Sequence, residues 1–315
     1  MSYRVIFLFI VLSVFLPVLT TAIGAQSPAA QTLVLPEKDA WLQSSLEQVL
    51  SGTPFKKLVL QDQLCVALVD LSNPEVIRYA GVHDDRMRYA ASLPKIGVLL
   101  AAFNQINRGN LKYTPELKGR MEQMIRHSSN RAATQLVEQV GFETIAKILT
   151  DSRYELYDPR QNGGLWVGKD YGGGPGRWRG DPLHNISHGA TARQVSRFLV
   201  MLDKGMLVNT WASQEMKEIL ARSGIQHKFV KGLAKRPESI IYRKSGTWKN
   251  FHSDSVLVER NGKKYVAVAL MVNPSPKEVL SRLIIQLDDI IHKDSKFELA
   301  KLRLGHRTEK GEASK

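Results

Sequence analysis

Cysteine is almost absent from this sequence, since Cys65 is the only one among 315 residues. A single thiol cannot form an internal disulfide, and without a cysteine near residues 20–30 the chain has no lipid-attachment site there. Cys65 lies within the apolar run of residues 64–69, which is typical of a buried strand. We therefore expect a buried structural thiol and not a nucleophile or a metal ligand.

Acidic residues are also scarce, with 30 Asp and Glu against 44 Lys and Arg, so the formal net charge is +14. This charge favours attraction to anionic cell-wall polymers or lipid head groups. No nucleic-acid-binding motif accompanies the charge, and we expect no nucleic-acid partner. The 43% of hydrophobic residues is enough for one large core or two modest lobes.

The N-terminus has the pattern of an export signal. A short cationic start at residues 1–4 precedes an apolar run over residues 5–19, and small residues follow. We predict a signal peptide over residues 1–25, cleaved after Gly24 or Ala25, which would send the protein to the periplasm or the medium. The alternative is an uncleaved anchor, because the apolar stretch approaches the roughly 20 residues that a membrane span needs.

After the signal peptide, composition predicts a linker over residues 26–37, a folded domain over residues 38–295 and a basic tail over residues 296–315. Short β-type runs are predicted near the two ends of the domain, at residues 64–70, 76–80, 240–242, 255–258 and 264–272. Helices are predicted from apolar spacing at residues 41–50, 96–109, 117–127, 131–140, 142–149, 191–205, 211–221 and 278–292.

This order of elements predicts an α+β fold. Strands at both ends of the domain imply one antiparallel sheet assembled from distant segments, covered by helices and joined to an all-helical lobe. Asn261-Gly262 is a strong hairpin signal between the last two strands. The Gly- and Trp-rich stretch of residues 158–189 is too long for a simple connector and is expected to carry function.

Ser92 and Lys95 form the first candidate catalytic pair. They stand at the predicted start of a helix, where positions three apart share one face. A serine needs an adjacent base to become nucleophilic, and a lysine can act as that base only if burial or neighbouring cations lower its pKa from about 10.4. By itself this four-residue pattern is weak evidence, because an ordinary surface helix start explains it.

Two further motifs follow in order. Residues 128–130 read Ser-Ser-Asn directly after a predicted helix, and residues 244–247 read Lys-Ser-Gly-Thr in a predicted strand. Taken singly, Ser128 and Asn130 could be a polar turn that caps the next helix, and Lys244 could be an exposed strand lysine. The occurrence of all three motifs in this order favours one shared site.

The ordered set resembles the S-x-x-K, S-x-N and K-[ST]-G elements of class A β-lactamases and penicillin-binding D,D-peptidases. Residues 190–194 and 261–266 extend the resemblance, which covers roughly residues 64–292. It implies a β-lactamase/transpeptidase-like fold with a five-stranded antiparallel sheet, flanking helices and a helical lobe. It also implies a serine hydrolase that forms an acyl-enzyme.

Carried over residue by residue, the resemblance makes Ser92 the nucleophile and Lys95 the candidate base. Ser128 would relay a proton to the departing nitrogen, and Lys244 would attract the substrate carboxylate and lower the pKa of Lys95. The backbone N–H groups of Ser92 and Thr247 would form the oxyanion hole. The expected substrate-binding residues are Asn130, Ser245, Gly246 and Thr247.

The chain departs from the class A pattern in two respects. The stretch between Ser92 and Ser128 is short, and residues 156–162 lack the E-x-x-L-N motif whose glutamate activates the deacylating water. Glu155 and Asp158 are the nearest carboxylates, although a loop-capping or surface role explains either one. We therefore expect slow deacylation.

The expected substrate is a β-lactam or a D-Ala-D-Ala-like peptide, which would react with a monomer that needs no cofactor. The alternatives are a cell-wall peptidase or esterase with little β-lactam turnover, and a non-catalytic wall-associated binding protein. His184 and His188 have a spacing of four, but they lie in Gly- and Pro-rich sequence without a third ligand, so we predict no metal site.

Overall fold

The computed structural model describes residues 32–173, 178–274 and 278–293. The predicted signal peptide, the first part of the predicted linker and the predicted tail lie outside the described residues. Among the described residues, no helix is both long enough and apolar enough to cross a membrane.

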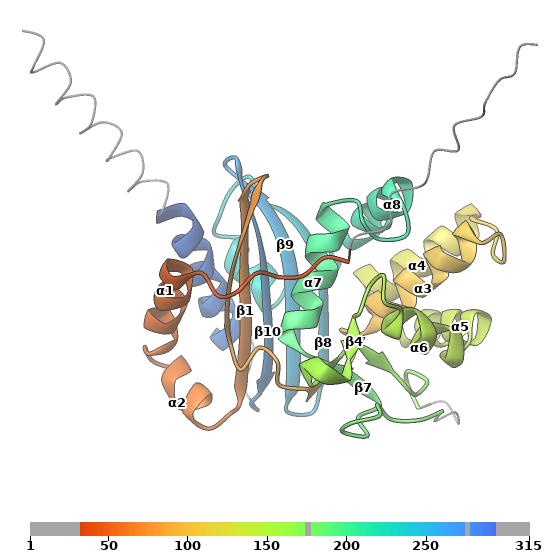
Figure 1. The fold of residues 1–315 in the computed structure, drawn as a ribbon, viewed down its shortest axis with the longest axis horizontal. Coiled ribbons are helices and arrows are strands. Elements are labelled where there is room, and N and C mark those ends of the chain that lie inside the picture. The colour runs from red at the N-terminus through yellow and green to blue at the C-terminus, as the bar shows by residue number, and fades with distance from the viewer. Residues whose placement is uncertain (1–31, 174–177, 275–277, 294–315) are drawn as a thin grey trace, which may run out of the picture. The chain divides into compact units, whose positions relative to one another are not determined.

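A five-stranded antiparallel sheet forms the centre of the fold (Figure 1). Its strand order joins two N-terminal strands to three C-terminal strands, because β1 pairs with β10 over the register Leu64↔Met271 to Asp70↔Tyr265. The strands in spatial order are β2 (Val76–Val82), β1 (Leu64–Asn73), β10 (Lys263–Val272), β9 (Phe251–Arg260) and β8 (Ile240–Trp248). The predicted sheet of distant segments is confirmed.

Side chains of β1 alternate between two hydrophobic cores, as the period of two along a strand requires. Cys65, Ala67 and Val69 face one core, whereas Leu64, Val66 and Leu68 face the other. Both faces are covered, which explains why this strand reads as a continuous apolar run. Cys65 is fully buried, and burial raises the pKa of its thiol to about 11, as expected for a structural cysteine.

Helices cover both faces of the sheet (Figure 1). On one face lie α1 (Ala40–Leu50), α2 (Phe55–Leu60), α9 (Phe229–Leu233) and the C-terminal helix of residues 278–293. On the other face lies α7 (Ala192–Asp203), whose capping residue Thr191 accepts a hydrogen bond from the Gln194 N–H. The helical lobe beyond α7 contains α3 (Lys95–Asn107), α4 (Pro115–Arg126), α5 (Asn130–Val140), α6 (Phe142–Thr150) and α8 (Thr210–Leu220).

The hairpin predicted at Asn261-Gly262 joins β9 to β10. Both residues have positive φ, 48° and 69°, as the tight turn that matches the twist of a hairpin requires. The described parts of the long segment, residues 158–173 and 178–189, form short strands and one helical turn. These are β4 (Tyr157–Asp158), η1 (Pro159–Gln161), β5 (Gly163–Gly164), β6 (Trp166–Val167) and β7 (His188–Ala190), and β7 also pairs with β3 (Arg88–Tyr89).

The folded region begins earlier than the predicted boundary near Lys38. Leu35 is buried in the core, and the carbonyl of Leu33 accepts hydrogen bonds from the Arg197 guanidinium at 2.6 and 3.0 Å. Residues 32–37 are therefore attached to the domain and do not behave as a linker. The sequence pattern misses this because a partner 164 positions away, on α7, provides the attachment.

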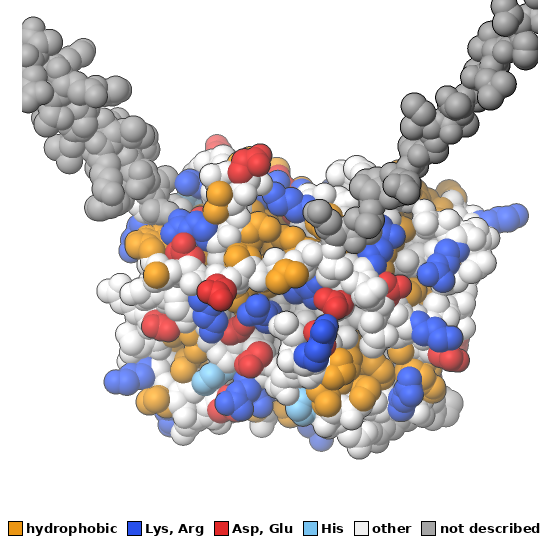
Figure 2. Space-filling view, in the orientation of Figure 1, with side chains coloured by type: hydrophobic (Ala, Val, Ile, Leu, Met, Phe, Trp, Pro, Cys, Tyr) orange, Lys and Arg blue, Asp and Glu red, His pale blue; other side chains and the backbone are white. Residues whose placement is uncertain are grey.

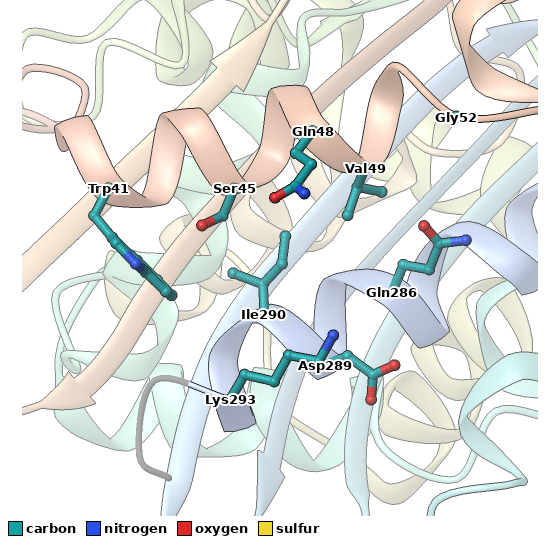
Figure 3. Close-up of a pocket in the computed structure, with 9 residues that line it drawn as sticks. All are labelled: Trp41, Ser45, Gln48, Val49, Gly52, Gln286, Asp289, Ile290 and Lys293. Carbon is teal, nitrogen blue, oxygen red and sulfur yellow. The ribbon is translucent and has the colours of Figure 1, made fainter. Parts of the chain in front are cut away.

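A surface groove of about 410 Å³ lies between α1 and the C-terminal helix (Figure 3). Trp41 forms one end of it, 42% exposed, with the Arg78 guanidinium 4.9 Å from its ring. None of the predicted catalytic residues lines this groove. Figure 2 shows one face of the molecule, where Lys and Arg side chains are scattered among acidic ones and do not gather in one patch.

Candidate active site

Ser92 lies in a turn that leads into α3. The N–H groups of Lys95, Ile96 and Gly97 bond to carbonyls three residues earlier, so the chain already coils before the regular helix begins at Lys95. Ser92 thus precedes the helix by three residues, whereas the sequence placed it at the helix start. The turn leaves Ser92 partly exposed while Lys95 enters the core.

The amine of Lys95 is completely buried. It donates hydrogen bonds to the Ser128 carbonyl at 2.7 Å and to Asn130 Oδ1 at 2.9 Å. Burial of the amine lowers its pKa to about 7. The predicted fall in pKa is found, and of the two causes expected, burial and a neighbouring lysine, burial accounts for it. A substantial fraction of the neutral amine is therefore present at neutral pH.

The three side chains of residues 128–130 have different structural roles. Ser129 caps α5 by accepting a hydrogen bond from the Ala132 N–H at 3.2 Å. Ser128 has a left-handed backbone, with φ of 57°, and its hydroxyl accepts a hydrogen bond from Lys244 Nζ at 2.9 Å. Because Ser129 supplies the cap, the side chains of Ser128 and Asn130 remain available to the site.

Strand β8 brings residues 244–247 alongside Ser92. A Cβ at Gly246 would collide with the Ala90 carbonyl and lie 2.7 Å from the backbone nitrogen of Ser92. Only glycine allows this approach. Ser245 is buried, whereas Thr247 is exposed at the end of the strand.

A group of buried cations lies behind this strand. Lys228 donates to the Gly246 carbonyl at 2.7 Å and to Thr247 Oγ1 at 2.8 Å. Arg243 makes two hydrogen bonds of 2.8 Å with the carboxylate of Asp254, which is fully buried. The pKa of the Lys244 amine lies well below its usual value, because of burial first and then repulsion from Lys95 and Arg243.

The loop before β7 closes the other side of the site. Tyr171 places its ring 4.6 Å from Lys95 Nζ, and the ring centroid of His188 lies 4.3 Å from that of Tyr171. Burial lowers the pKa of His188 to about 4, so its ring is neutral near pH 7 and donates from Nε2 to the Lys169 carbonyl at 2.9 Å. His184 bonds instead to Asn162, at 3.1 Å.

These elements surround a cleft of about 980 Å³. Ser92, Asn130 and Thr247 line it directly, and Lys95, Ser128, Lys244 and Gly246 lie immediately behind these residues through the contacts given above. Aromatic and amide side chains form much of the remaining wall, including Tyr89, Tyr171, Asn185, Trp248 and Phe251. The three motifs thus meet at one cleft between the sheet and the helical lobe.

The two carboxylates nearest in sequence to the missing motif are engaged elsewhere. Arg160 pairs with Glu155 at 3.1 Å and with Asp158 at 3.1 Å. Burial opposes ionisation of Asp158, but the hydrogen bonds from Arg160 outweigh it and hold the pKa of Asp158 below its usual value. Neither side chain lines the cleft, and Asp170 is the carboxylate that does so among the described residues.

Motif reasoning did not find Tyr171, Asp170 or Lys228. Tyr171 and Asp170 fall in the Gly- and Trp-rich stretch that the sequence marked as functional, but no spacing singled them out. Lys228 lies 16 positions before Lys244 in a segment without a recognisable pattern. Only the folded chain shows that its amine reaches the strand of residues 244–247.

Comparisons with solved structures agree with this architecture. The solved structure of PBP-A aligns with a TM-score of 0.61 at 18% sequence identity. The alignment covers 84% of this chain and 99% of the PBP-A chain. A beta-lactamase from Sphaerobacter thermophilus has a TM-score of 0.60 at 13% identity, covering 78% of this chain and 95% of its own. A class A beta-lactamase from Bacteroides cellulosilyticus has a TM-score of 0.58 at 17% identity, covering 80% and 97%. These likenesses confirm the predicted fold.

A search of curated proteins gave no match. A family model described as the beta-lactamase enzyme family matches residues 116–294, more than half of the chain. The match includes the motifs at residues 128–130 and 244–247 but begins after Ser92 and Lys95, whose catalytic roles remain predictions from the sequence motif. Motif order, sheet topology and the family match agree, and the chain belongs to the beta-lactamase enzyme family.

Proposed function

We propose that this protein is a serine hydrolase whose Ser92 is acylated by β-lactams. The observation that carries the proposal is the meeting of residues 92–95, 128–130 and 244–247 at one cleft. These segments are far apart in the sequence, and separate structural roles for each would not require them to converge. Together they supply a nucleophile, a base and cations for a carboxylate.

In the proposed acylation, Ser92 Oγ attacks the lactam carbonyl and loses its proton to the neutral Lys95 amine. The N–H groups of Ser92 and Thr247 stabilise the oxyanion. As the C–N bond breaks, the Ser128 hydroxyl donates its proton to the departing nitrogen and recovers one from the cationic amines beside it. The 2.9 Å hydrogen bond from Lys244 fits this relay.

Carboxylate recognition would come from the same strand. Lys244 and Lys228 concentrate positive charge behind residues 245–247, and the Thr247 hydroxyl is exposed at the cleft. Charge-assisted contacts in a partly dehydrated cleft are strong and directional. Both β-lactams and D-Ala-D-Ala-like peptides present a carboxylate near the reactive carbonyl, so this feature suits either class.

Release of the acyl group is proposed to be slow for β-lactams. Water needs a positioned base to attack the ester, and the described hydrogen-bond partners of the Lys95 amine include no carboxylate. Glu155 and Asp158 are paired with Arg160, and Asp170, the carboxylate that lines the cleft among the described residues, is not one of the hydrogen-bond partners of the Lys95 amine. The opened lactam also stays attached to its former leaving nitrogen, which hinders the approach of water.

A second candidate is a cell-wall D,D-peptidase or esterase. The absence of a carboxylate among the described hydrogen-bond partners of the Lys95 amine favours it, because the amine itself must then act as the base for both half-reactions. The amine product of a peptide substrate diffuses away and leaves space for water or a second amine. Export by residues 1–25 and attraction of the basic chain to wall polymers would fit this role.

Intact mass measured over time after addition of a penicillin tests the proposal. We expect one adduct per chain that persists for minutes or longer, and no adduct on Ser92→Ala. Rapid adduct decay with many turnovers would support an efficient β-lactamase, and hydrolysis of a D-Ala-D-Ala peptide with a persistent penicillin adduct would support the peptidase. Absence of any adduct on the wild-type chain would reject acylation and favour the non-catalytic binding protein.

A further inference from the structure

Tyr171 lies against the proposed base in an unusual manner. Its ring centroid is 4.6 Å from Lys95 Nζ, a distance typical of a cation–π contact. The side chain is 7% exposed, and its hydroxyl is buried without a hydrogen-bond partner among the described residues. A buried polar group without a partner is uncommon and calls for an explanation. The ring, and not the hydroxyl, makes the contact with the amine.

The protein holds Tyr171 firmly in this position. Thr134 Oγ1 accepts a hydrogen bond from the Tyr171 N–H at 3.1 Å and donates one to the Tyr171 carbonyl at 2.9 Å. The next residue, Gly172, has φ of 82°, and a Cβ there would lie 3.0 Å from Asn130 Cβ. The loop is therefore tied to α5, the helix that also carries Asn130, which is a partner of the Lys95 amine.

The other groups that face the Lys95 amine are neutral or cationic. Its hydrogen-bond acceptors are the carbonyls of Ser128 and Ser129 and the amide oxygen of Asn130. The titratable groups near it include Lys244 and His188, and the charge of Lys95 lowers the pKa of each of them. Within the described residues, the electron-rich face of Tyr171 is the contact of aromatic character that favours the ammonium form.

We propose that Tyr171 is a positioning residue for Lys95, whose ring face holds the amine against Ser128 and Asn130 and favours its protonated form. This inference rests on the proposed function, in which Lys95 exchanges a proton with Ser92. The ring lets the buried amine accept and hold that proton without a carboxylate. The Tyr171 hydroxyl is not required, which agrees with its lack of a partner.

The first test is the pH dependence of acylation by a fluorescent penicillin for the wild type, Tyr171→Phe and Tyr171→Leu. Tyr171→Phe keeps the ring and should retain the wild-type midpoint of the acid limb and a rate within about threefold. Tyr171→Leu removes the π face, so the midpoint should move to lower pH by about 0.5 to 1.5 units. The maximal rate should fall as well, because the amine is no longer held.

Tyr89→Leu is the matched control, since Tyr89 also forms an aromatic wall of the cleft but makes no cation–π contact with Lys95 in the described part of the chain. Its midpoint should match the wild type whatever happens to its rate. An unchanged midpoint in Tyr171→Leu would overturn the proposal, as would an equal shift in Tyr89→Leu. A large loss in Tyr171→Phe would assign the role to the hydroxyl and also overturn it.

The second test needs no substrate. Carbon NMR titration of protein labelled with ¹³C-lysine, with the Lys95 signal assigned by its loss in Lys95→Arg, reads the pKa of the amine directly. We expect a lower midpoint in Tyr171→Leu than in the wild type and Tyr171→Phe. If penicillin fails to label the wild type but this shift is found, the proposed function fails and the effect of Tyr171 on Lys95 stands. If penicillin labels the wild type but the shift is absent, the proposed function stands and the role of Tyr171 is rejected.

Discussion

Lys244 Nζ donates a hydrogen bond to Ser128 Oγ over 2.9 Å, although 116 positions of sequence separate the two residues. The contact joins the central sheet to the helical lobe across the back of the cleft. Lys244 also donates to the Ser245 carbonyl at 2.6 Å, which holds the amine in its buried position. The pair therefore fixes the spacing of the two lobes at the point where the proposed chemistry occurs.

Replacement of Lys244 by alanine should slow acylation by penicillin. The variant loses a charge-assisted contact to the substrate carboxylate and the partner of the Ser128 hydroxyl, which we expect to cost roughly 1.5 to 3 kcal/mol in transition-state free energy. The second-order acylation rate constant, measured with a fluorescent penicillin, reports the loss. Lys263→Ala, at the start of β10 and away from the cleft, is the control and should acylate like the wild type. An unchanged rate in Lys244→Ala would place this residue outside the reaction.

Replacement of Lys95 by methionine should stabilise the fold in a manner that depends on pH. The pKa of the amine is about 7 in the folded chain and near 10.5 when exposed, so burial of the charged form opposes folding. This penalty is fully present below pH 7 and fades as pH rises to 10.5, where the amine is neutral in both states. At pH 6 the variant should gain about 1 to 3 kcal/mol, after allowance for its lost hydrogen bonds.

Urea unfolding of the wild type and Lys95→Met at pH 6, 8 and 10 measures this difference. The gain should shrink steadily across that range. Lys147→Met, whose amine is exposed and paired with Glu143, is the control and should show no such trend. A gain in stability that is the same at all three pH values would mean that burial does not lower the pKa of the Lys95 amine.

Replacement of Gly246 by alanine should lower the acylation rate strongly and the stability of the fold much less. A Cβ there would collide with the Ala90 carbonyl and press on the Ser92 nitrogen, so β8 must move away from the nucleophile. Because both proposed oxyanion donors shift, we expect a loss of at least roughly a hundredfold in the acylation rate. Gly119→Ala, on α4 with open space around it, is the matched control and should keep full activity. Equal rates in the two variants would refute the close approach of β8 to Ser92.

Replacement of Asp254 by asparagine should destabilise the protein strongly. Asp254 pairs with Arg243, and both are buried beside Lys244 and Lys228. Without this carboxylate the buried Arg243 guanidinium loses its ion-pair partner, which we expect to cost about 3 to 5 kcal/mol in the free energy of unfolding. Glu143→Gln breaks the exposed pair with Lys147 and should cost less than about 1 kcal/mol. Denaturant unfolding of both variants measures the two losses of unfolding free energy. Similar losses would contradict a special cost for breaking the buried pair.

Several features follow from the sequence alone. The residues of β1 alternate between two cores and are apolar on both faces, and Asn261-Gly262 can adopt the two positive φ angles of a tight turn. Such properties are local, because side-chain period and backbone freedom act over a few residues. The order of the three motifs was equally readable, and it predicted the residues that now meet at the cleft.

Only the tertiary structure decided what surrounds the reactive groups. Glu155 and Asp158, for which the sequence favours a loop-capping or surface role, pair with Arg160, whereas Tyr171 reaches the Lys95 amine. Burial or a neighbouring cation could lower the pKa of Lys95 as far as the sequence shows, and only the fold establishes that burial does so. Burial and contact depend on segments brought together by packing, so neither the pKa of Lys95 nor its partners can be read from residue spacing.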